Sequence, residues 1–439
     1  MRLIRTESSL RSQIEATLQR ARILVDSKIG VVESLELAHN PPGVPAFYRY
    51  RAKRNPLRTP EGELLHDQRD MSGFDIGWGF KRDPAHAQIA ALGEAVERYC
   101  CTHTAGHTII NAPFRRITGS ALDPTLVARP TAAQLHGRNI GLRPVDQDTP
   151  LLWVPATEVP TGTPTWVPAD LVFLPSPQGW SIREQISTGL ACGSSFWHAT
   201  LSGFCEVVER DAYAIHWLMR LPGYRVAVET IPDSETRRIV QEFTAIGIQT
   251  TICNITTDLG IPTYLVVGQS EWAWPKFWVA ACSSLSAVSA VRGALAESFG
   301  QLCFLLTSER RVDTTEDIRS MHDHGFYYAS GRDSHLMRFF FDSSVRAFNS
   351  VDLSVGSYQE SAQYIAARLS EHGLKSYVVD LTTQDVRAAG LSVVRVIVPG
   401  LQFLHHAVPC LECPRMYAVA AKNGIDPHRP IALDPHPFP

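Results

Sequence analysis

The sequence predicts an α+β fold, in which helices and strands are mixed without a strict βαβ order. Three long helices are expected over residues 85–103, 197–220 and 286–306. Runs rich in β-branched residues, such as 250–256 and 391–401, predict strands between and after these helices. Because strand and helix do not alternate regularly along the chain, an α+β arrangement is favoured over a regular α/β one.

The first part of the chain contains two expected helices and two interruptions. Apolar residues at helical spacing predict an amphipathic helix over 7–25, and the proline-rich stretch 39–45 ends the regular structure after it. Residues 54–73 are polar and predict a long surface loop. Pro84 suits the first turn of a helix, so the helix over 85–103 is expected to begin there.

The remaining elements are expected to be mainly strands, apart from the two later helices. Residues 148–175 alternate short β-like runs with prolines, which favours edge strands and turns. The small residues of 187–195 predict a loop that leads into the second long helix. Residues 262–270 and 375–382 read as two further strands.

Composition excludes several classes of protein. The chain has 439 residues, 44% of them hydrophobic, and a net charge of -3, so neither nucleic acid nor an anionic membrane is expected as the main partner. The N-terminus lacks the apolar core of a signal peptide, and no run approaches the roughly 20 apolar residues of a membrane helix. We therefore expect a cytoplasmic protein. The nine cysteines read as buried thiols, and for Cys410 and Cys413 packed thiols are favoured over a zinc site.

Two of the expected helices carry the same charged face, with two glutamates and an arginine within one turn. These residues are Glu94, Glu97 and Arg98 in the first helix, and Glu206, Glu209 and Arg210 in the second. The third helix has Glu297 and Gln301 one turn apart. Their neighbours in sequence are mostly apolar or small, so the carboxylates are expected in largely buried helices, where an unpaired charge is costly.

The charges on these faces do not balance. Four glutamates against two arginines leave an excess of two negative charges, before Glu297 is counted. Mg²⁺ fills such a deficit, because carboxylates and phosphate oxygens are its usual ligands, and arginine binds phosphate through two hydrogen bonds. The pattern therefore predicts a Mg²⁺–polyphosphate site, with a solvated face of Glu–Arg pairs as the alternative. The sequence contains no GxxxxGK[ST] motif of the usual phosphate-binding loop.

The stretch "GEAVERY" and, far downstream, "STGLACGSSFWHATLSGFCEVVERDA" resemble the YcaO superfamily. Members of this superfamily bind ATP and Mg²⁺ between three glutamate-bearing helices, without a phosphate-binding loop. The resemblance implies a YcaO domain over residues 61–439, preceded by a helical and extended segment over 1–60. It implies that Mg²⁺ is held by Glu94, Glu97, Glu206, Glu209, Glu297 and Gln301, and that the nucleotide is contacted by Arg98, Arg210, Ser194 and Lys81.

The sequence departs from the family pattern at several nucleotide contacts. Gly-Lys-Gly commonly precedes the first helix, but residues 77–79 read Gly-Trp-Gly, so the lysine is absent or its role passes to Lys81. Ala90 stands at the position of a serine, and Ser194 at that of an asparagine. The glutamine of the third helix often falls one residue before Gln301.

The chain ends "DPHPFP", with prolines at alternate positions. Such a segment is stiff and extended, and by composition alone it reads as a disordered tail. Within the YcaO superfamily, however, a PxPxP terminus resembles the subgroup that forms azolines in ribosomal peptides. There the tail enters the active site and its carboxylate assists proton transfer, which implies a catalytic role for the carboxylate of Pro439.

The resemblance implies an ATP-dependent cyclodehydratase of the thiazole/oxazole-modified microcin type. Its substrate would be a ribosomally made precursor peptide, whose Cys, Ser or Thr residues become thiazoline or (methyl)oxazoline. The implied partners are a leader-binding E1-like or winged-helix protein and a flavin dehydrogenase, and a homodimer is expected by analogy. Two alternatives stay open: a thioamide- or macroamidine-forming YcaO enzyme, and a non-catalytic scaffold that binds peptide or partner.

Overall fold

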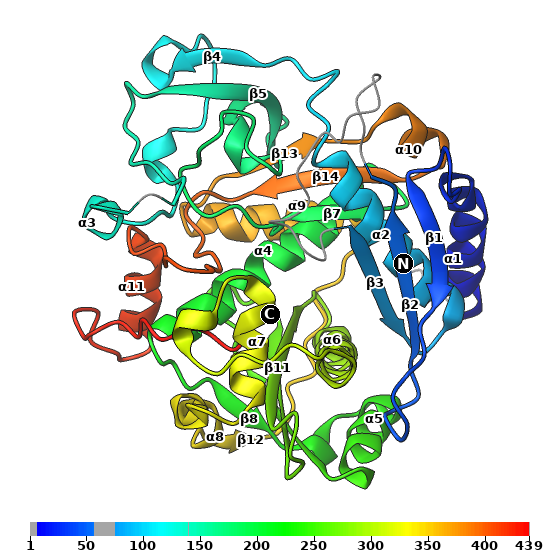
Figure 1. Cartoon of the computed structure of the whole chain (residues 1–439). Coiled ribbons are helices and arrows are strands. Elements are labelled where there is room, and N and C mark those ends of the chain that lie inside the picture. The colour runs from blue at the N-terminus through cyan, green and yellow to red at the C-terminus, as the bar shows by residue number, and fades with distance from the viewer. Residues whose placement is uncertain (1–6, 57–74, 139, 439) are drawn as a thin grey trace.

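The computed structural model describes residues 7–56, 75–138 and 140–438, which fold into three β-sheets with helices between and around them (Figure 1). The first sheet has the order β1 (Val32–Leu37), β2 (Tyr48–Arg54), β3 (Ile76–Lys81). The second has the order β11 (Phe277–Ser283), β10 (Thr263–Ser270), β9 (Ile248–Asn254), β8 (Tyr224–Val226), β12 (Val345–Arg346). The third has the order β4 (Ile110–Pro113), β5 (Pro150–Val159), β13 (Ser376–Asp380), β14 (Ser392–Ile397), β7 (Leu190–Gly193), and β6 (Pro164–Pro168) pairs with β5.

The three long helices expected from the sequence are present, and the mixed α+β class is confirmed. They are α2 (Pro84–Cys100), α4 (Phe196–Leu218) and α6 (Ala287–Thr307). The other described helices are α1 (Glu7–Ala21), α3 (Ala132–Leu135), α5 (Ser234–Ala245), α7 (Met321–Ala329), α8 (Arg338–Phe341), α9 (Tyr358–Glu371), α10 (Gln384–Ala388) and α11 (Pro414–Lys422). Asp83 caps α2 by accepting the His86 N–H, and Pro84 occupies the first turn as expected.

One sequence-based expectation is wrong. Residues 187–195 were expected to be a loop, but residues 190–193 form strand β7 at one edge of the third sheet. Its small residues pair with β14 in antiparallel register, from Leu190 opposite Arg395 to Gly193 opposite Ser392. Hydrogen bonds to a neighbouring strand outweigh the weak intrinsic strand preference of small residues, which the sequence pattern alone cannot show. Most of the loop expected over 54–73 lies outside the described residues.

Each long helix packs against a different combination of sheets. Helix α2 lies on the first sheet and also contacts β7, whereas α6 lies against β10 and β11 and also contacts β3. Helix α4 contacts β7 and β14 of the third sheet and β10 and β11 of the second, so it lies between these two sheets. The charged faces of the three helices are therefore carried into the region where the sheets meet.

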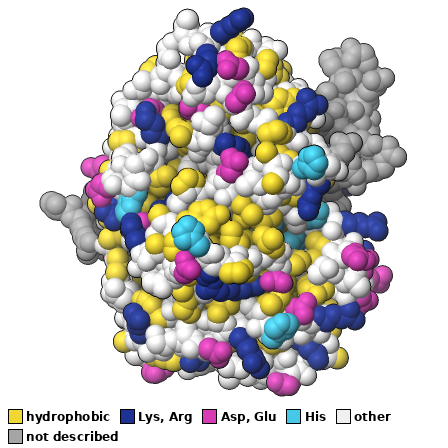
Figure 2. Space-filling model, turned by 90° about the vertical axis from the view of Figure 1, so that its left-hand side faces the viewer, with side chains coloured by type: hydrophobic (Ala, Val, Ile, Leu, Met, Phe, Trp, Pro, Cys, Tyr) yellow, Lys and Arg dark blue, Asp and Glu magenta, His cyan; other side chains and the backbone are white. Residues whose placement is uncertain are grey.

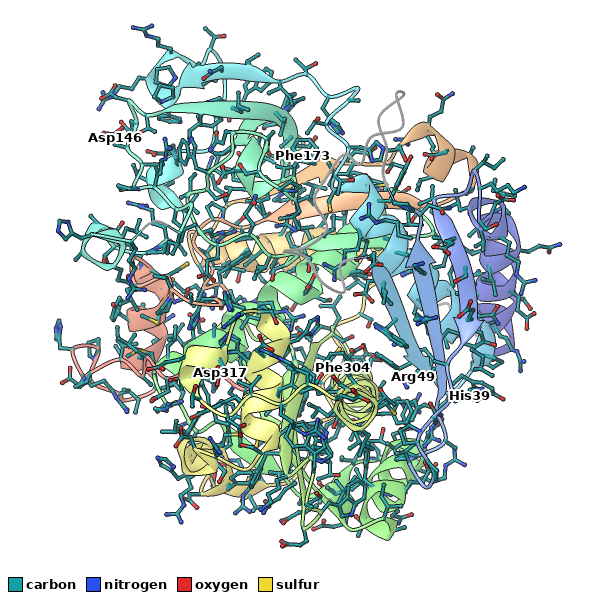
Figure 3. All side chains as sticks on the ribbon, in the orientation of Figure 1. His39, Arg49, Asp146, Phe173, Phe304 and Asp317 are labelled. Atoms are coloured by element: carbon teal, nitrogen blue, oxygen red, sulfur yellow. The ribbon has the colours of Figure 1, made fainter. Side chains whose placement is uncertain are left out.

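The first sheet is joined to α6 by a buried cation. The guanidinium of Arg49 on β2 donates to His39 O at 3.2 Å and to Thr307 Oγ1 at 3.5 Å, and it lies 4.5 Å from the centre of the Trp78 ring. Figure 3 shows Arg49 on the side of the sheet that faces α6, which carries Phe304. This contact holds β3 and α6 side by side.

The surface has no strong single-sign charge on the face that carries α3 and α11. Figure 2 shows hydrophobic side chains gathered across the middle of this face, with charged side chains of both signs around them. Within the described ranges, no helix is both long and apolar enough to span a bilayer.

Two glycines allow β3 to lie directly on α2. A Cβ atom at Gly77 would approach the Ala95 backbone nitrogen to 2.5 Å, and one at Gly79 would overlap the Ala87 carbonyl oxygen. These are the glycines of the Gly-Trp-Gly stretch, so their role here is close packing of strand on helix. The approach places the Trp78 amide beside the charged face of α2.

We predict that Gly79→Ala lowers the free energy of unfolding by about 3 kcal/mol, because the new methyl group overpacks a backbone contact that cannot relax. Gly93→Ala is the matched control: its Cβ would lie 3.6 Å from the Cys192 Cβ atom, an ordinary contact within a helix. It should be neutral or stabilising by up to about 1 kcal/mol. Urea unfolding measures both, and equal free energies for the two variants would contradict this account of the β3–α2 packing.

Candidate functional site

The two carboxylates of α2 accept hydrogen bonds from the backbones of two different sheets. The Trp78 N–H on β3 donates to Glu94 Oε2 at 2.8 Å. The Cys192 N–H on β7 donates to Glu97 Oε1 at 2.7 Å. The charged face of α2 is thus attached to both the first and the third sheet.

The two carboxylates of α4 are held in the same way. The Gly189 N–H, directly before β7, donates to Glu206 Oε2 at 3.0 Å, and the Ser283 N–H at the end of β11 donates to Glu209 Oε2 at 3.3 Å. Hydrogen bonds from backbone amides stabilise the ionised form of a carboxylate and fix its direction. The four glutamates therefore connect two helices to all three sheets.

The arginines pair with these glutamates within their own helices. Arg98 lies 3.0 Å from Glu94, and Arg210 lies 3.4 Å from Glu206 and 2.8 Å from Glu209. Both arginine side chains are one-fifth exposed. The site is therefore open to solvent on one side, as a ligand would require, and the predicted Glu–Arg faces are formed.

The carboxylates also act on one another. Burial, the repulsion of Glu94 and, less strongly, that of Glu206 raise the pKa of Glu97 to about 8. Burial raises the pKa of Glu209 to about 7, with further contributions from Glu206 and Glu297 and against the opposing effect of Arg210. Because glutamates of α2, α4 and α6 act on each other's charge, the structure brings the three predicted faces together.

The third helix adds one carboxylate and one amide. Crowding by protein atoms raises the pKa of Glu297, although its side chain is reached by solvent, and the charge of Lys81 at the end of β3 opposes this. Gln301, one turn further on α6, is buried, and its Nε2 finds no hydrogen-bond acceptor among the described residues. A Cβ at Gly300 would overlap the Phe80 ring, so a side chain at position 300 would require that ring to move.

Comparison with known proteins identifies the family. A family model for the YcaO cyclodehydratases, described as ATP- and Mg²⁺-binding, matches residues 78–402. The chain belongs to the YcaO family. The expected ATP and Mg²⁺ are confirmed as its cofactors.

Individual relatives agree with this assignment. An uncharacterised protein of Methanothermobacter thermautotrophicus is 27% identical over 86% of this chain and 91% of its own length. A solved heterocyclase in complex with substrate and cofactor has a TM-score of 0.78 at 21% identity, over 97% of this chain and 57% of its own. The YcaO protein of Methanopyrus kandleri, bound with AMPPCP and Mg²⁺, has a TM-score of 0.62 at 20% identity, over 88% of this chain and 91% of its own. This YcaO chain thus spans little more than half the length of that heterocyclase.

Ser194 lies apart from the glutamates, at the junction of β7 and α4. Its Oγ lies 3.1 Å from His198 Nδ1, and the His198 ring stacks on Tyr358 with centres 4.4 Å apart. His198, one turn after Ser194 on the same motif, is a neighbour that the sequence pattern did not indicate. The charges of His198 and Lys81 both act on His86, in the first turn of α2. Lys81 and Ser194 therefore flank the same end of this helix.

The residues of this YcaO site suit a divalent cation in charge and in donor type. Their carboxylate oxygens are the ligands that Mg²⁺ prefers. Burial and the mutual repulsion of the glutamates raise the pKa values of Glu97 and Glu209, and a nearby cation would oppose both effects. Across the described ranges, however, no three Asp, Glu, His or Cys side chains converge closely enough to hold one ion. The carboxylates thus form a common wall, on which an ion would be held by one or two carboxylates together with phosphate oxygens.

The C-terminal tail reaches this wall. The Phe438 ring lies 4.5 Å from the Arg210 guanidinium and 4.7 Å from the Tyr213 ring, and Phe438 is buried. Pro439, for which the sequence predicts a catalytic role, lies outside the described residues. Its predecessor nevertheless packs on the arginine of the second charged face.

We predict that Mg²⁺ with ATP stabilises the protein more at high pH than at low pH. Glu97 and Glu209 ionise near pH 8 and 7 in the folded protein, but near 4.5 when unfolded. The folded ion-free protein therefore holds more protons between these values, and its free energy of unfolding falls as pH rises through this window. Mg²⁺ binds the ionised carboxylates and offsets that loss.

Thermal unfolding with and without Mg²⁺ and ATP, at about pH 6 and about pH 8.5, measures this linkage. EDTA should reverse the added stability. An equal shift of the melting temperature at the two pH values would contradict an ion site made of these carboxylates.

Proposed function

We propose that this YcaO protein is an ATP-dependent cyclodehydratase that forms azolines in a ribosomally made precursor peptide. One observation carries the proposal: glutamates and arginines of distant segments share a wall that the proline-rich tail also reaches, at Arg210. The tail residue Phe438 therefore lies beside an arginine that we assign to phosphate binding.

The reaction must turn the oxygen of a substrate amide into a good leaving group. A Cys, Ser or Thr side chain of the substrate attacks the preceding carbonyl carbon, losing its proton and giving a tetrahedral hemiorthoamide. The former amide oxygen then takes the γ-phosphoryl group of ATP, and ADP leaves. Loss of phosphate, with the nitrogen proton, forms the C=N bond of thiazoline or (methyl)oxazoline. The enzyme supplies position and charge stabilisation, and no enzyme nucleophile is needed.

Each predicted residue has a role in this scheme. We assign Mg²⁺ binding to Glu94, Glu97, Glu206, Glu209, Glu297 and Gln301. Bound Mg²⁺ neutralises phosphate charge. The Arg98 and Arg210 guanidinium groups hold phosphate oxygens, while Lys81 and Ser194 contact the nucleotide from the end of α2. The Pro439 carboxylate acts as the base or orients it.

Partners are part of the proposal. The solved heterocyclase is longer, and this chain spans 57% of it. We infer that a separate E1-like or winged-helix protein recognises the leader of the precursor peptide, that a flavin dehydrogenase oxidises azolines to azoles, and that the chain is a homodimer.

Mass spectrometry of a Cys/Ser-rich precursor peptide, incubated with the protein, its partner, Mg²⁺ and ATP, tests the reaction. Azoline formation removes about 18 Da per ring, whereas a gain of about 16 Da per site indicates a thioamide. Unchanged peptide mass without ADP release would favour a non-catalytic scaffold.

We predict that Glu206→Ala or Glu209→Ala lowers ATP turnover by at least about a hundredfold, because each removes a ligand of the ion that neutralises the phosphates. Both variants should fold, since the repulsion relieved in the ion-free site offsets the loss of one backbone hydrogen bond. Glu371→Ala, at the exposed end of α9, is the matched control. ADP release measures turnover and circular dichroism measures folding; retained turnover would contradict the metal assignment.

We predict that a tag added after Pro439 blocks ring formation far more than the same tag on the N-terminus does. A tag adds residues beyond Phe438, which is buried against Arg210, and it removes the terminal carboxylate. Peptide mass loss over time compares the two proteins. If both form rings at the same rate, the tail has no part in the reaction.

A further inference from the structure

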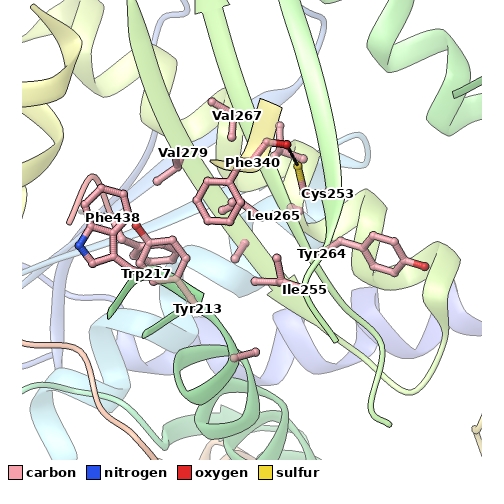
Figure 4. Packing of buried hydrophobic residues seen from close by; sticks show 14 of the residues in the cluster. Tyr213, Trp217, Cys253, Ile255, Tyr264, Leu265, Val267, Val279, Phe340 and Phe438 are labelled. Atoms are coloured by element: carbon pink, nitrogen blue, oxygen red, sulfur yellow. Dashed lines mark hydrogen bonds between the residues drawn. The ribbon is translucent and has the colours of Figure 1, made fainter. Parts of the chain in front are cut away.

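The last described residues of the chain do not lie on the surface. His436 is 1% exposed and Phe438 is 5% exposed, and Pro437 between them is also buried. In Figure 4 the Phe438 ring lies beside Tyr213 and Trp217 of α4. Residues 434–438, here called the tail, therefore pass through the interior and must have their polar atoms paired there.

The tail offers mainly hydrogen-bond acceptors to the residues around it. Pro435 and Pro437 have no N–H group, so the backbone of this segment presents more carbonyl oxygens than N–H groups. The His436 ring makes its own contact, from Nε2 to His405 O at 2.8 Å. The residues around such a segment must therefore donate hydrogen bonds to its carbonyl oxygens.

The body supplies one side-chain contact for each of three successive tail carbonyls. Trp217 Nε1–H donates to the carbonyl oxygen of residue 434 at 3.0 Å, and the Tyr328 hydroxyl donates to that of residue 435 at 2.7 Å. His324 Nδ1 lies 2.9 Å from the carbonyl oxygen of residue 436. His324 and Tyr328 are four residues apart on α7, so they face the tail from one side of that helix.

The entrance of the tail is held by charge. Arg220, just after α4, forms a 2.8 Å ion pair with Asp434, and its guanidinium lies 4.0 Å from the centre of the Trp217 ring. At the other end, the Phe438 ring covers the Arg210 guanidinium. The tail is therefore held along its length between two arginines.

His324 makes a second contact, which links the tail to the rest of the fold. Its Nε2 lies 2.9 Å from His406 O. The Glu184 carboxylate accepts the N–H groups of His406, Ala407 and Val408, which fixes this turn. Because burial lowers the pKa of His324 to about 4, the ring is neutral near pH 7 and has one proton to donate. The contact of Nδ1 with the tail is buried, whereas that of Nε2 with His406 O is only partly buried, so leaving the tail carbonyl unpaired costs more.

We propose that Trp217, His324 and Tyr328 form a receptor for a proline-rich segment with few N–H groups, and that His324 holds it through an Nδ1–H donated to the carbonyl oxygen of residue 436. His324 is a positioning residue: it aligns the tail so that Phe438 lies beside Arg210. The binding stands on the contacts above, while its effect on ring formation rests on the proposed function.

Hydrogen exchange of the full chain, followed by mass spectrometry of the peptide that contains residues 431–439, tests the receptor. Tyr328→Phe removes one donor and leaves the carbonyl of residue 435 buried and unpaired, so exchange in this peptide should rise on the order of tenfold or more. Tyr417→Phe is the matched control, because the Tyr417 hydroxyl donates to Leu411 O at 3.2 Å, away from the tail. Exchange in α9 reports any general loss of stability.

Two variants of His324 distinguish the roles of its two ring nitrogens. His324→Asn places an amide donor near the position of Nδ1, and His324→Gln places one near that of Nε2. The proposal expects tail exchange close to wild type in the Asn variant and raised on the order of tenfold in the Gln variant. Equal exchange in the two variants would overturn the role given to Nδ1. Unchanged tail exchange in Tyr328→Phe would overturn the receptor.

Peptide mass loss in the same variants tests the link to function. Ring formation should fall in Tyr328→Phe and His324→Gln while ATP affinity is retained. Faster tail exchange with an unchanged rate of ring formation would support the receptor but remove the tail from the proposed reaction. A wild-type protein that forms no rings would refute the proposed function, while the exchange data would still decide on the receptor.

Discussion

The site depends on hydrogen bonds between glutamates of two helices and the backbones of three sheets. Glu94 and Glu97 accept hydrogen bonds from backbone N–H groups of β3 and β7. Glu206 and Glu209 accept them from the N–H groups of Gly189 and of the end of β11. A carboxylate held by a backbone amide cannot turn away to solvent without leaving that amide unpaired. These bonds both position the charged groups and connect the layers of the fold.

The same arrangement places more carboxylates than cations in the site. Several carboxylates share a partly buried wall with fewer cations; burial first, and repulsion by neighbouring glutamates second, raise the pKa values of Glu97 and Glu209. A polyphosphate with Mg²⁺ is the kind of ligand that suits these charges, because the metal neutralises carboxylates and the arginines bind the phosphates. The charge of these helices therefore suits the ATP and Mg²⁺ that the family binds.

The tail adds a second use of buried polarity. Its prolines lack N–H groups, and side chains of α4 and α7 contact its carbonyl oxygens. A segment that reads as a disordered terminus by composition is thereby ordered, because each carbonyl of three successive residues meets a side chain. The glutamate wall and the tail meet at Arg210, which contacts Glu209 on one side and Phe438 on the other.

The sequence by itself determined the α+β class, the three long helices and their charged faces, because helical spacing and the Glu–Arg motifs are local properties. It did not reveal that residues 190–193 form strand β7, since a run of small residues becomes a strand only when β14 pairs with it. Nor did it identify His324 and Tyr328, which lie more than a hundred residues from the tail that they contact. Contacts between distant segments arise from packing, and only the tertiary structure decided them.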